Sequence, residues 1–218
     1  MEKMPYQPEL ERATTIATPS SVTTSDWRKS LPVLAGSNFV LRELRAEDAP
    51  SLLAMLTTEE VSRFISPPPT TVEGFERFIA WAQREREMGN YVCYGVVPAG
   101  MTTAVGLFQL RSLEPGFGSC EWGFAIGSQY WGTGMFVEGA RAILDFGVDV
   151  IGAQRFEARA AVANGRGNGA LRKLGAVQEG VLRRSFLRHG QYYDQVLWSI
   201  LAEDWRFMRM AHQAAVVH

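Results

Sequence analysis

The 218-residue sequence contains only two cysteines, which make no disulfide framework. Cys93 and Cys120 both lie in strand-like apolar stretches, so we expect them to be reduced residues of the core. They also lack metal-ligand spacing with the three histidines. The sequence therefore predicts no metal site and no disulfide-stabilised scaffold.

An excess of charge of one sign is also missing. The formal net charge is −1, which gives no general attraction to nucleic acid or to an acidic membrane surface. No apolar run is long enough for a transmembrane helix, and the N-terminus has no hydrophobic signal segment. We therefore expect a cytoplasmic protein without a nucleic-acid or membrane partner. Its apolar residues, 46% of the chain, can form the core of one domain.

Residues 1–30 differ in composition from the rest of the chain. The run from Thr14 to Ser25 is small, polar and without periodicity, which is typical of a mobile extension. Trp27 is placed to pin the end of this extension to the domain or to a second subunit. We predict one folded domain over residues 31–210, followed by a tail over 211–218. A homodimer through the extension or the C-terminal strands is a further expectation.

Hydrophobic periodicity divides the domain into helices and strands. Apolar and polar residues alternate over 38–44, which predicts a half-buried strand. At Tyr91 the period changes, and two apolar runs separated by a turn predict a hairpin. A strand, a helix and a strand follow one another over 119–162, which indicates a parallel crossover. Helices are predicted near 45–56, 58–65, 71–83 and 136–148, and strands at 38–44, 91–97, 104–110, 119–126, 155–162 and 196–201.

A glycine-containing loop joins the strand at 119–126 to the helix that follows. It reads Gln129-Tyr-Trp-Gly132-Thr-Gly134, a Q-x-x-G-x-G pattern. The two glycines allow a sharp turn and the close approach of a ligand. The helix directs free N–H groups and the positive end of its dipole into the loop, which favours a phosphate or pyrophosphate. Neither standard glycine-rich phosphate motif is present, so an ordinary strand–helix turn is the alternative interpretation.

This pattern resembles the acetyl-coenzyme A (acetyl-CoA) pyrophosphate loop of the GNAT acetyltransferase superfamily. The wider run, Glu121-x-Gly-Phe-x-Ile before the loop and Gly134-x-x-x-Glu138 after it, resembles the branch of ribosomal-protein N-terminal (alanine and serine) acetyltransferases. A later stretch from Asn164 to Gly175 is similar to the family segment N-x-x-S-x-x-x-L-x-K-L-G. The resemblance covers residues 37–206. It implies an α/β (α+β) fold with a mixed, twisted sheet of about seven strands, flanked by helices and splayed at the cofactor slot.

The resemblance also implies the reaction. It is acetyl transfer from acetyl-CoA, as cosubstrate, to a primary amine by direct attack in a ternary complex. The acceptor is a small-molecule or peptide amine, including a protein N-terminus. The end of the strand at 119–126 is expected to pair with pantetheine like an added strand, and its N–H groups to polarise the thioester carbonyl. The expected cofactor-binding residues are Phe124, Ala125, Ile126, Gln129, Tyr130, Trp131, Gly132, Thr133, Gly134, Met135, Asn164 and Asn168.

Glu121 is the candidate catalytic residue. A protonated amine is not a nucleophile, so a base must take its proton directly or through water, and the resemblance places an acidic residue at this strand position. The alternative is a structural carboxylate that bonds a neighbouring strand or helix. Glu138 is expected to be structural or to complement the helix dipole.

Two positions depart from the family pattern and leave the general acid unassigned. Leu171 stands where many relatives have a tyrosine, and Gly167 stands where this branch often has a serine. Ser185, Tyr192 and Tyr193 are the substitutes that the sequence offers. The departures leave open a non-catalytic sensor of CoA or acyl-CoA. A loop that binds another phosphate ligand is a third interpretation.

Overall fold

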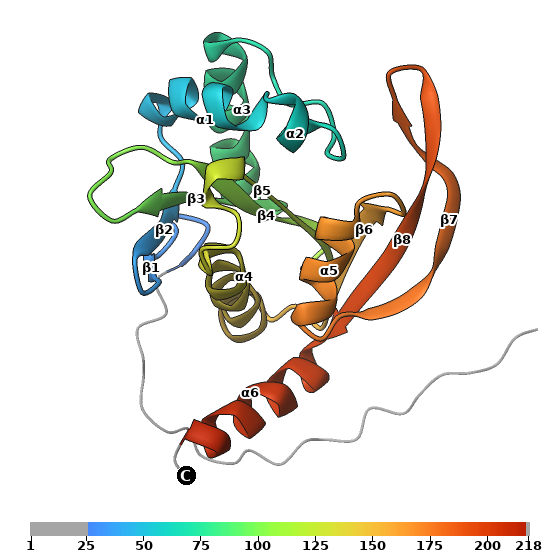
Figure 1. Cartoon of the computed structure of the whole chain (residues 1–218). Coiled ribbons are helices and arrows are strands. Elements are labelled where there is room, and N and C mark those ends of the chain that lie inside the picture. Colours follow the sequence, from blue (N-terminus) through green and yellow to red (C-terminus); the bar gives the residue numbers. More distant parts are fainter. Residues whose placement is uncertain (1–25, 217–218) are drawn as a thin grey trace, which may run out of the picture.

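The computed structural model describes residues 26–216, with side chains as far as residue 211 (Figure 1). Eight strands form one sheet in the order β1-β2-β3-β4-β5-β6-β8-β7. The strands are β1 (Leu34–Ala35), β2 (Phe39–Glu43), β3 (Tyr91–Pro98), β4 (Gly106–Ser112), β5 (Ser119–Ile126), β6 (Arg155–Ala161), β7 (Val177–Arg188) and β8 (Gln191–Leu201). Only β5 and β6 pair in parallel within this sheet. This confirms the predicted mixed α/β fold, and the short β1 accounts for the eighth strand.

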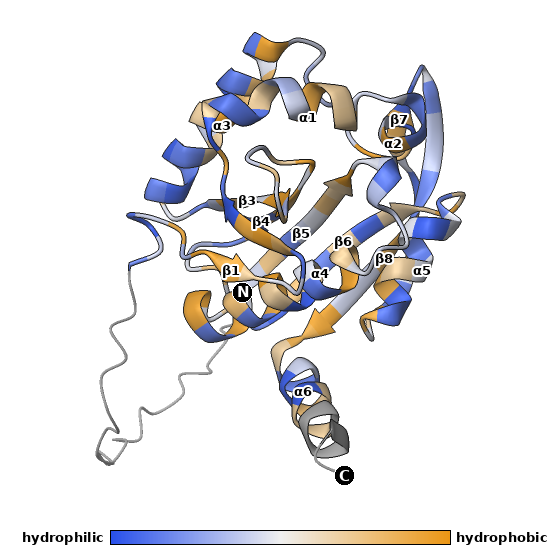
Figure 2. Ribbon diagram, turned by 60° about the vertical axis from the view of Figure 1, so that its left-hand side comes forward, coloured by the Kyte–Doolittle hydropathy of each residue, from blue (hydrophilic) through white to orange (hydrophobic). Residues whose placement is uncertain are grey.

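Helices cover both faces of the sheet, and they alternate between hydrophilic and hydrophobic residues along their length (Figure 2). Alternate residues of β3 therefore enter two separate cores: Tyr94 packs in the cluster that includes α4, whereas Cys93 packs in the cluster that includes α1 and α3. The helical segments are η1 (Ala46–Asp48), α1 (Ala49–Leu56), α2 (Glu59–Ser62), α3 (Val72–Glu87), η2 (Ser128–Tyr130), α4 (Met135–Phe146), the π-helical turn η3 (Gly147–Ile151), α5 (Gly165–Lys173) and α6 (Ala202–Val216). None of the helices within residues 26–216 has the length and apolar character to cross a membrane.

A buried ion pair fixes the position of the first helical segments, η1 and α1. Both carboxylate oxygens of Asp48 accept from the Arg42 guanidinium, each at 2.8 Å. The same carboxylate accepts from the N–H groups of Arg45 and Ala104, also at 2.8 Å each. Asp48 thus joins β2, the start of α1 and the β3–β4 turn. These bonds hold α1 against the sheet.

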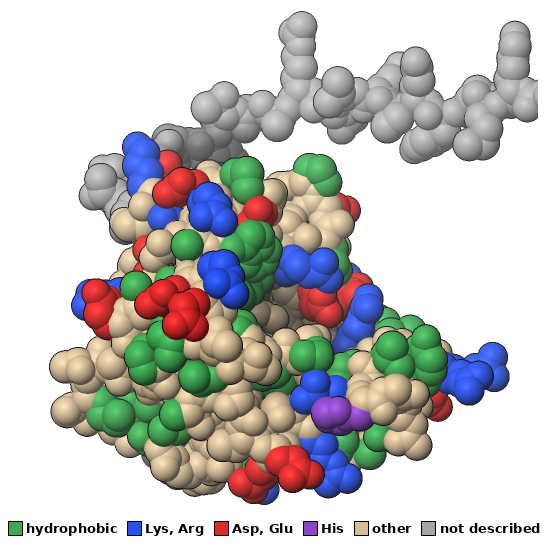
Figure 3. Space-filling view, turned by 90° about the horizontal axis from the view of Figure 1, so that it is seen from above, with side chains coloured by type: hydrophobic (Ala, Val, Ile, Leu, Met, Phe, Trp, Pro, Cys, Tyr) green, Lys and Arg blue, Asp and Glu red, His purple; other side chains and the backbone are tan. Residues whose placement is uncertain are grey.

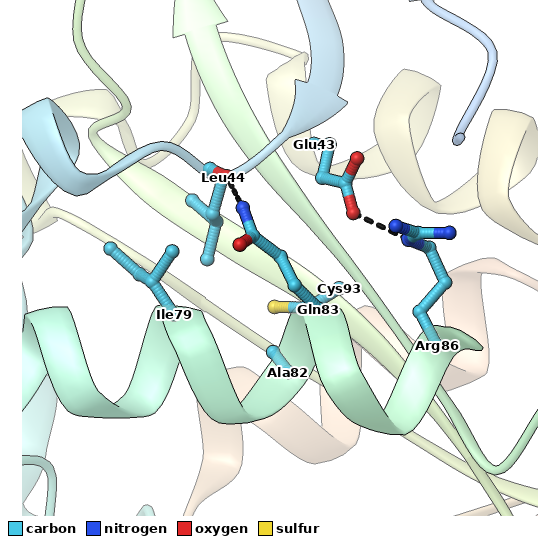
Figure 4. A pocket seen from close by; sticks show the side chains of 7 residues that line it. All are labelled: Glu43, Leu44, Ile79, Ala82, Gln83, Arg86 and Cys93. Atoms are coloured by element: carbon cyan, nitrogen blue, oxygen red, sulfur yellow. Dashed lines mark hydrogen bonds and ion pairs between the residues drawn. The ribbon is translucent and has the colours of Figure 1, made fainter. Parts of the chain in front are cut away.

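The helix α3 is tied to the neighbouring strand β2 by polar side chains (Figure 4). The Arg86 Nε donates to Glu43 at 2.6 Å, and the Gln83 amide donates to the Leu44 carbonyl at 3.0 Å. The cavity that these residues line holds about 10 Å³. That volume is about that of one water-sized probe, so this pocket is no substrate site.

The ends of the folded part differ from the predicted boundaries. Trp27 and Leu31 are buried in the main core, so the packed structure includes residues before 31. At the other end, Trp205 in the first turn of α6 is buried in the core. The helix continues to Val216, beyond the boundary predicted at 210. The predicted mobile run at 14–25 lies outside the described residues.

The strands β5 and β6 separate soon after they begin. Their three paired positions are Ser119 with Arg155, Cys120 with Phe156, and Glu121 with Glu157. The rest of β5 continues to Ile126 beside β4 alone. The sheet is therefore splayed beyond Glu121, and we call the opening between the two diverging strands the slot.

Candidate active site

The loop after β5 adopts a backbone that requires glycine at two positions. Gly132 and Gly134 have φ values of 79° and 90°, a left-handed region that side chains with a Cβ rarely enter. A Cβ at Gly132 would meet no atom within 4 Å, so the chain presents open space there. The first helical bond of α4 runs from the Glu138 N–H to the Gly134 carbonyl at 3.1 Å, which leaves the N–H groups of residues 135–137 ahead of it.

The other predicted loop residues are partly engaged within the protein. The N–H groups of Tyr130 and Trp131 donate to the carbonyls of Gly127 and Ser128, at 2.9 and 3.1 Å. The Thr133 hydroxyl donates to the Tyr130 carbonyl at 2.7 Å. The Gln129 amide contacts the sulfur of Met55 at 3.4 Å. None of these bonds uses the main-chain N–H groups from Gly132 onward.

The main-chain direction of β5 determines which groups face the slot. The Gly127 N–H donates to the Val105 carbonyl at 3.0 Å, so this pair is of the hydrogen-bonded type. Since such pairs alternate in an antiparallel ladder, the main-chain groups of Ala125 point to β4. Those of Phe124 and Ile126 point the other way, to the slot. The predicted edge for pantetheine is thus made by Phe124 and Ile126, whereas the main-chain groups of Ala125 bond to β4.

Trp131 closes one end of this edge. Its indole N–H donates to the Ile126 carbonyl at 2.9 Å. The guanidinium of Arg166, on α5, lies 4.2 Å from the centre of the indole ring. A side chain of the loop and a side chain beyond β6 therefore meet over the end of the slot.

Asn164 forms the N-cap of α5 and contacts Gly167, one of the two departures from the family pattern. Its Oδ1 accepts from the Gly167 N–H at 2.8 Å. A Cβ at Gly167 would lie 2.5 Å from the Asn164 Nδ2, a distance that real Cβ atoms do not show. A serine at this position would therefore require the Asn164 amide to move.

The side-chain amide of Asn168 makes hydrogen bonds within the fold. Its Nδ2 donates to the carbonyls of Ala161 and Asn164, at 2.9 and 2.8 Å, and its Oδ1 accepts from Trp198 at 2.9 Å. With 8% of its surface exposed, it joins α5 to β6 and β8. The sequence suggested a cofactor contact for Asn168, but these bonds use its amide, and we leave it out of the site proposed below.

Glu121 lies among charged groups, which differs from the apolar setting that its strand suggested. One carboxylate oxygen, Oε2, is paired with Arg111 on β4. The other, Oε1, has the Arg159 Nε of β6 at 4.0 Å. Its side chain is 27% exposed, and the residue belongs to the last β5–β6 pair, where the slot begins. Oε1 is the less engaged oxygen and the one on the side of β6.

Glu138 has the structural contact that its position suggested. Its carboxylate accepts from the N–H and the hydroxyl of Ser37, at 2.9 and 3.0 Å. These bonds hold the turn between β1 and β2 against the first turn of α4, and they lower the pKa of Glu138. A groove of about 380 Å³ lies beside this turn, between residues 36–40 and 97–101, and no charged residue lines it.

The predicted substitutes for the general acid lie in the β7–β8 hairpin. The Ser185 hydroxyl donates to the Leu182 carbonyl at 2.9 Å, and the Tyr193 hydroxyl donates to Gln191 at 2.8 Å. Tyr192 is 57% exposed, whereas Leu171 is buried. Viewed from above, the surface is hollowed between the α1–α3 region and this hairpin, with acidic and basic side chains on its walls (Figure 3).

Sequence reasoning missed a side-chain pair next to Glu121. The Tyr91 hydroxyl donates to the Gln109 Oε1. A Cβ at Gly123 would lie 3.1 Å from the Gln109 Nε2, so the Gln109 amide lies over β5 at that glycine. The glycine in an otherwise apolar strand was the signal of a close approach, but its partner depends on the β4–β5 register.

The two cysteines are free and buried, as expected. Burial raises the pKa of both the Cys93 and the Cys120 thiol to about 12. They are therefore protonated core residues and supply no nucleophile.

Comparison with known proteins places this site in a family. The model of the acetyltransferase (GNAT) domain matches residues 38–177. The N-acetyltransferase YoaA of Bacillus subtilis is 24% identical over 175 residues, which is 78% of this chain and 97% of YoaA. The crystal structure of the ribosomal-protein-S5-alanine acetyltransferase from Vibrio fischeri has a TM-score of 0.72 at 17% identity and covers 80% of this chain and 98% of its own. RimJ of Mycobacterium smegmatis, solved with CoA-disulfide, has a TM-score of 0.69 at 19% identity, with 76% and 83% covered.

A splayed sheet with a glycine loop at the start of a helix is an arrangement suited to an extended, phosphate-bearing ligand. With the domain match over more than half of its length, the chain belongs to the GNAT acetyltransferase family. It is an acetyltransferase of that class.

Proposed function

We propose that the protein transfers the acetyl group of acetyl-CoA to a primary amine in a ternary complex. The observation that carries the proposal is the continuity of two features. The slot-facing main-chain groups of Phe124 and Ile126 lead directly into the loop of Gly132 and Gly134 at the start of α4. An open strand edge suits the amides of pantetheine, and the N–H groups of the helix start suit the pyrophosphate.

The residues of this chain have separate tasks in the proposal. N–H groups of residues 132–137 hold the pyrophosphate, and Asn164 supplies its amide Nδ2 on the opposite wall of the slot. The Phe124 and Ile126 N–H groups polarise the thioester carbonyl. Glu121 takes one proton of the acceptor ammonium through water, and the second amine proton leaves with the CoA thiol. Acetyl-CoA supplies the activated acyl group.

The proposed acceptor is a protein or peptide N-terminus, with a small amine as the alternative. A structural neighbour named as a ribosomal-protein-S5-alanine acetyltransferase supports this choice. The hollow between the α1–α3 region and the β7–β8 hairpin is the expected approach for a peptide (Figure 3). Nucleic acid and membranes have no part in the proposal.

Location and assembly complete the proposal. Two buried free cysteines fit a reducing compartment such as the cytoplasm. The sheet ends at β7, a strand of 12 residues whose neighbour in the described sheet lies only on one side. We propose this edge as the contact of a homodimer, because an unpaired edge is a template for pairing with a second chain. Light scattering of the purified protein tests the dimer.

The test of the function has a binding arm and a turnover arm. Calorimetric titration compares acetyl-CoA with adenosine 3′,5′-bisphosphate, which lacks pantetheine. Release of the CoA thiol is then followed with peptides that begin with Ala or Ser and with N-acetylated copies as controls. Tight binding of acetyl-CoA together with thiol release from the free-amine peptides supports the proposal. Equal affinity for the two ligands contradicts the assignment of the slot.

The second candidate function is a non-catalytic sensor of CoA or acyl-CoA. It is favoured by the burial of Leu171, which leaves no hydroxyl at the family's position for the acid. The sensor predicts saturable acetyl-CoA binding without thiol release in the presence of any amine.

A further inference from the structure

The pair of Tyr91 and Gln109 lies on the same sheet face as Glu121. The pairing register places Tyr91, Arg111 and Glu121 in one row across β3, β4 and β5. Gln109 and Gly123 belong to the next row toward the open end of the slot. Gln109 is half-buried on this face.

Tyr91 fixes the orientation of the Gln109 amide. The tyrosine is 4% exposed, and its ring lies 4.8 Å from that of Trp81. Burial raises the pKa of the Tyr91 phenol well above its usual value, so the hydroxyl stays protonated and donates. The Gln109 oxygen is therefore occupied, and its NH₂ group is the end that lies over Gly123.

The position over Gly123 is the first on this face beyond the last β5–β6 pair. Gly123 is two residues from Glu121, a separation of about 6.6 Å along a strand. Two hydrogen bonds of about 2.8 Å each, meeting at one oxygen atom, span most of such a gap. Gln109 and Glu121 therefore belong to neighbouring rows of one sheet face, a spacing of the order that one water bridges.

We propose that Gln109 is a positioning residue that holds the water through which Glu121 receives the proton of the acceptor amine. This inference rests on the proposed function. The water oxygen accepts one hydrogen bond from the Gln109 NH₂ and one from the acceptor ammonium, and it donates to Glu121. The ammonium proton moves to the water as a water proton moves to the carboxylate. The freed nitrogen then forms the C–N bond as the C–S bond breaks, and its second proton leaves with the thiol.

The charged and titratable groups around this path come from three strands. Arg111 of β4 and Arg159 of β6 are paired with Glu121, and Glu157 of β6 is its register partner. Tyr91 and Cys93 approach from β3, and both have raised pKa values.

The test is the pH profile of kcat/KM for the most active of the Ala- and Ser-initiated peptides, in wild type and Gln109→Leu. A peptide α-amino group has a pKa of about 8, so above that pH the amine arrives deprotonated and needs no relay. We expect Gln109→Leu to be slower by about 10-fold or more at pH 6.5 and by only about 2-fold at pH 9.5, since general-base catalysis contributes at least that much. Acetyl-CoA affinity should be unchanged by calorimetry.

Two further variants sharpen the test. Tyr91→Phe frees the Gln109 oxygen without removing the amide, so we expect the same pH-dependent loss at smaller size. Gln154→Leu removes an exposed glutamine whose amide donates to the Gly152 carbonyl just before β6 begins, and it should match wild type at every pH. A loss in Gln109→Leu that is equal at all pH values, or no loss, overturns the inference while acetyl transfer by wild type stands. Absence of transfer by wild type overturns the proposed function and the relay with it.

Discussion

Trp131 and Ile126 are joined by a hydrogen bond that competes with the proposed ligand. The indole N–H takes the carbonyl that Ile126 directs to the slot, at 2.9 Å. The main-chain groups at this end of β5 are those we assign to pantetheine. An amide N–H of acetyl-CoA that donates to this carbonyl therefore competes with the indole N–H.

Trp131→Phe should consequently bind acetyl-CoA more tightly than wild type. The phenyl ring keeps an aromatic surface for Arg166, 4.2 Å from the indole ring in the present structure, but it cannot donate to Ile126. One hydrogen bond contributes about 1 kcal/mol, so we expect an increase in affinity of about five-fold by calorimetry. Trp205→Phe, which removes an indole hydrogen bond to Asp145 of α4 at 2.8 Å, serves as the matched control. Weaker binding in Trp131→Phe would show that the indole supports the ligand instead of competing with it.

Gly134→Ala should weaken acetyl-CoA binding by about ten-fold or more, because a left-handed residue with a Cβ costs about 1–2 kcal/mol and the loop will reorganise to avoid it. The Cβ itself has room, since its nearest contact is Glu138 at 3.6 Å. Gly116→Ala is a matched control, with the same φ of 90° and no atom within 4 Å of its Cβ, in the turn before β5. Both variants should melt at lower temperature than wild type, and only Gly134→Ala should lose affinity. Equal affinities for acetyl-CoA in the two variants would show that the loop does not bind the ligand.

The part of the site that the sequence predicted consists of local features. The strand at 119–126, the left-handed glycines of the loop and the helix after them are all set within one continuous stretch of chain. The pairing of Gln109 with Tyr91 and the bond from Trp131 to Ile126 were not predicted. The first depends on the register of β3 against β4, which no local pattern fixes. The second depends on how a loop side chain folds back onto its own strand.

The charged surroundings of Glu121 were likewise not predicted from the sequence. The strand pattern placed a carboxylate near the slot, but Arg111 and Arg159 come from the neighbouring strands on either side. Their positions follow from pairing across the sheet, which also sets where β5 and β6 part. The setting of a predicted catalytic group is therefore a tertiary property, even where its identity can be read from the chain.

Glu121→Gln should lower kcat by about 100-fold at neutral pH, since the amide cannot accept the proton and general-base catalysis contributes at least about that factor. Acetyl-CoA affinity should change little, because the carboxylate faces the acceptor side. Glu179→Gln breaks a comparable pair with Arg155 on the same sheet and should keep wild-type turnover. Thiol release with the peptide substrate measures both variants. Full activity in Glu121→Gln would show that the carboxylate has a structural role only.

Asp48→Asn should be the most destabilising of these changes. Burial alone would raise the pKa of Asp48, but the hydrogen bonds from Arg42 and from the N–H groups of Arg45 and Ala104 outweigh it and hold the pKa below its usual value. The substitution leaves the Arg42 guanidinium, in a residue 9% exposed, without its counter-charge. Breaking such a buried pair costs about 3–5 kcal/mol, which urea unfolding at pH 7 will measure.

The pH dependence of unfolding tests the same ion pair. Because the pKa of Asp48 is lower in the folded than in the unfolded state, its contribution to stability is present above the unfolded pKa. It is lost as the pH falls through the lower, folded value. Wild type should therefore lose this contribution in acid, and Asp48→Asn should lack that component of the slope. The double variant Arg42→Met with Asp48→Asn should recover part of the loss at pH 7, since it removes the unpaired charge but leaves the N–H groups of Arg45 and Ala104 with a weaker acceptor. No recovery would place the stabilisation in those two N–H bonds rather than in the ion pair.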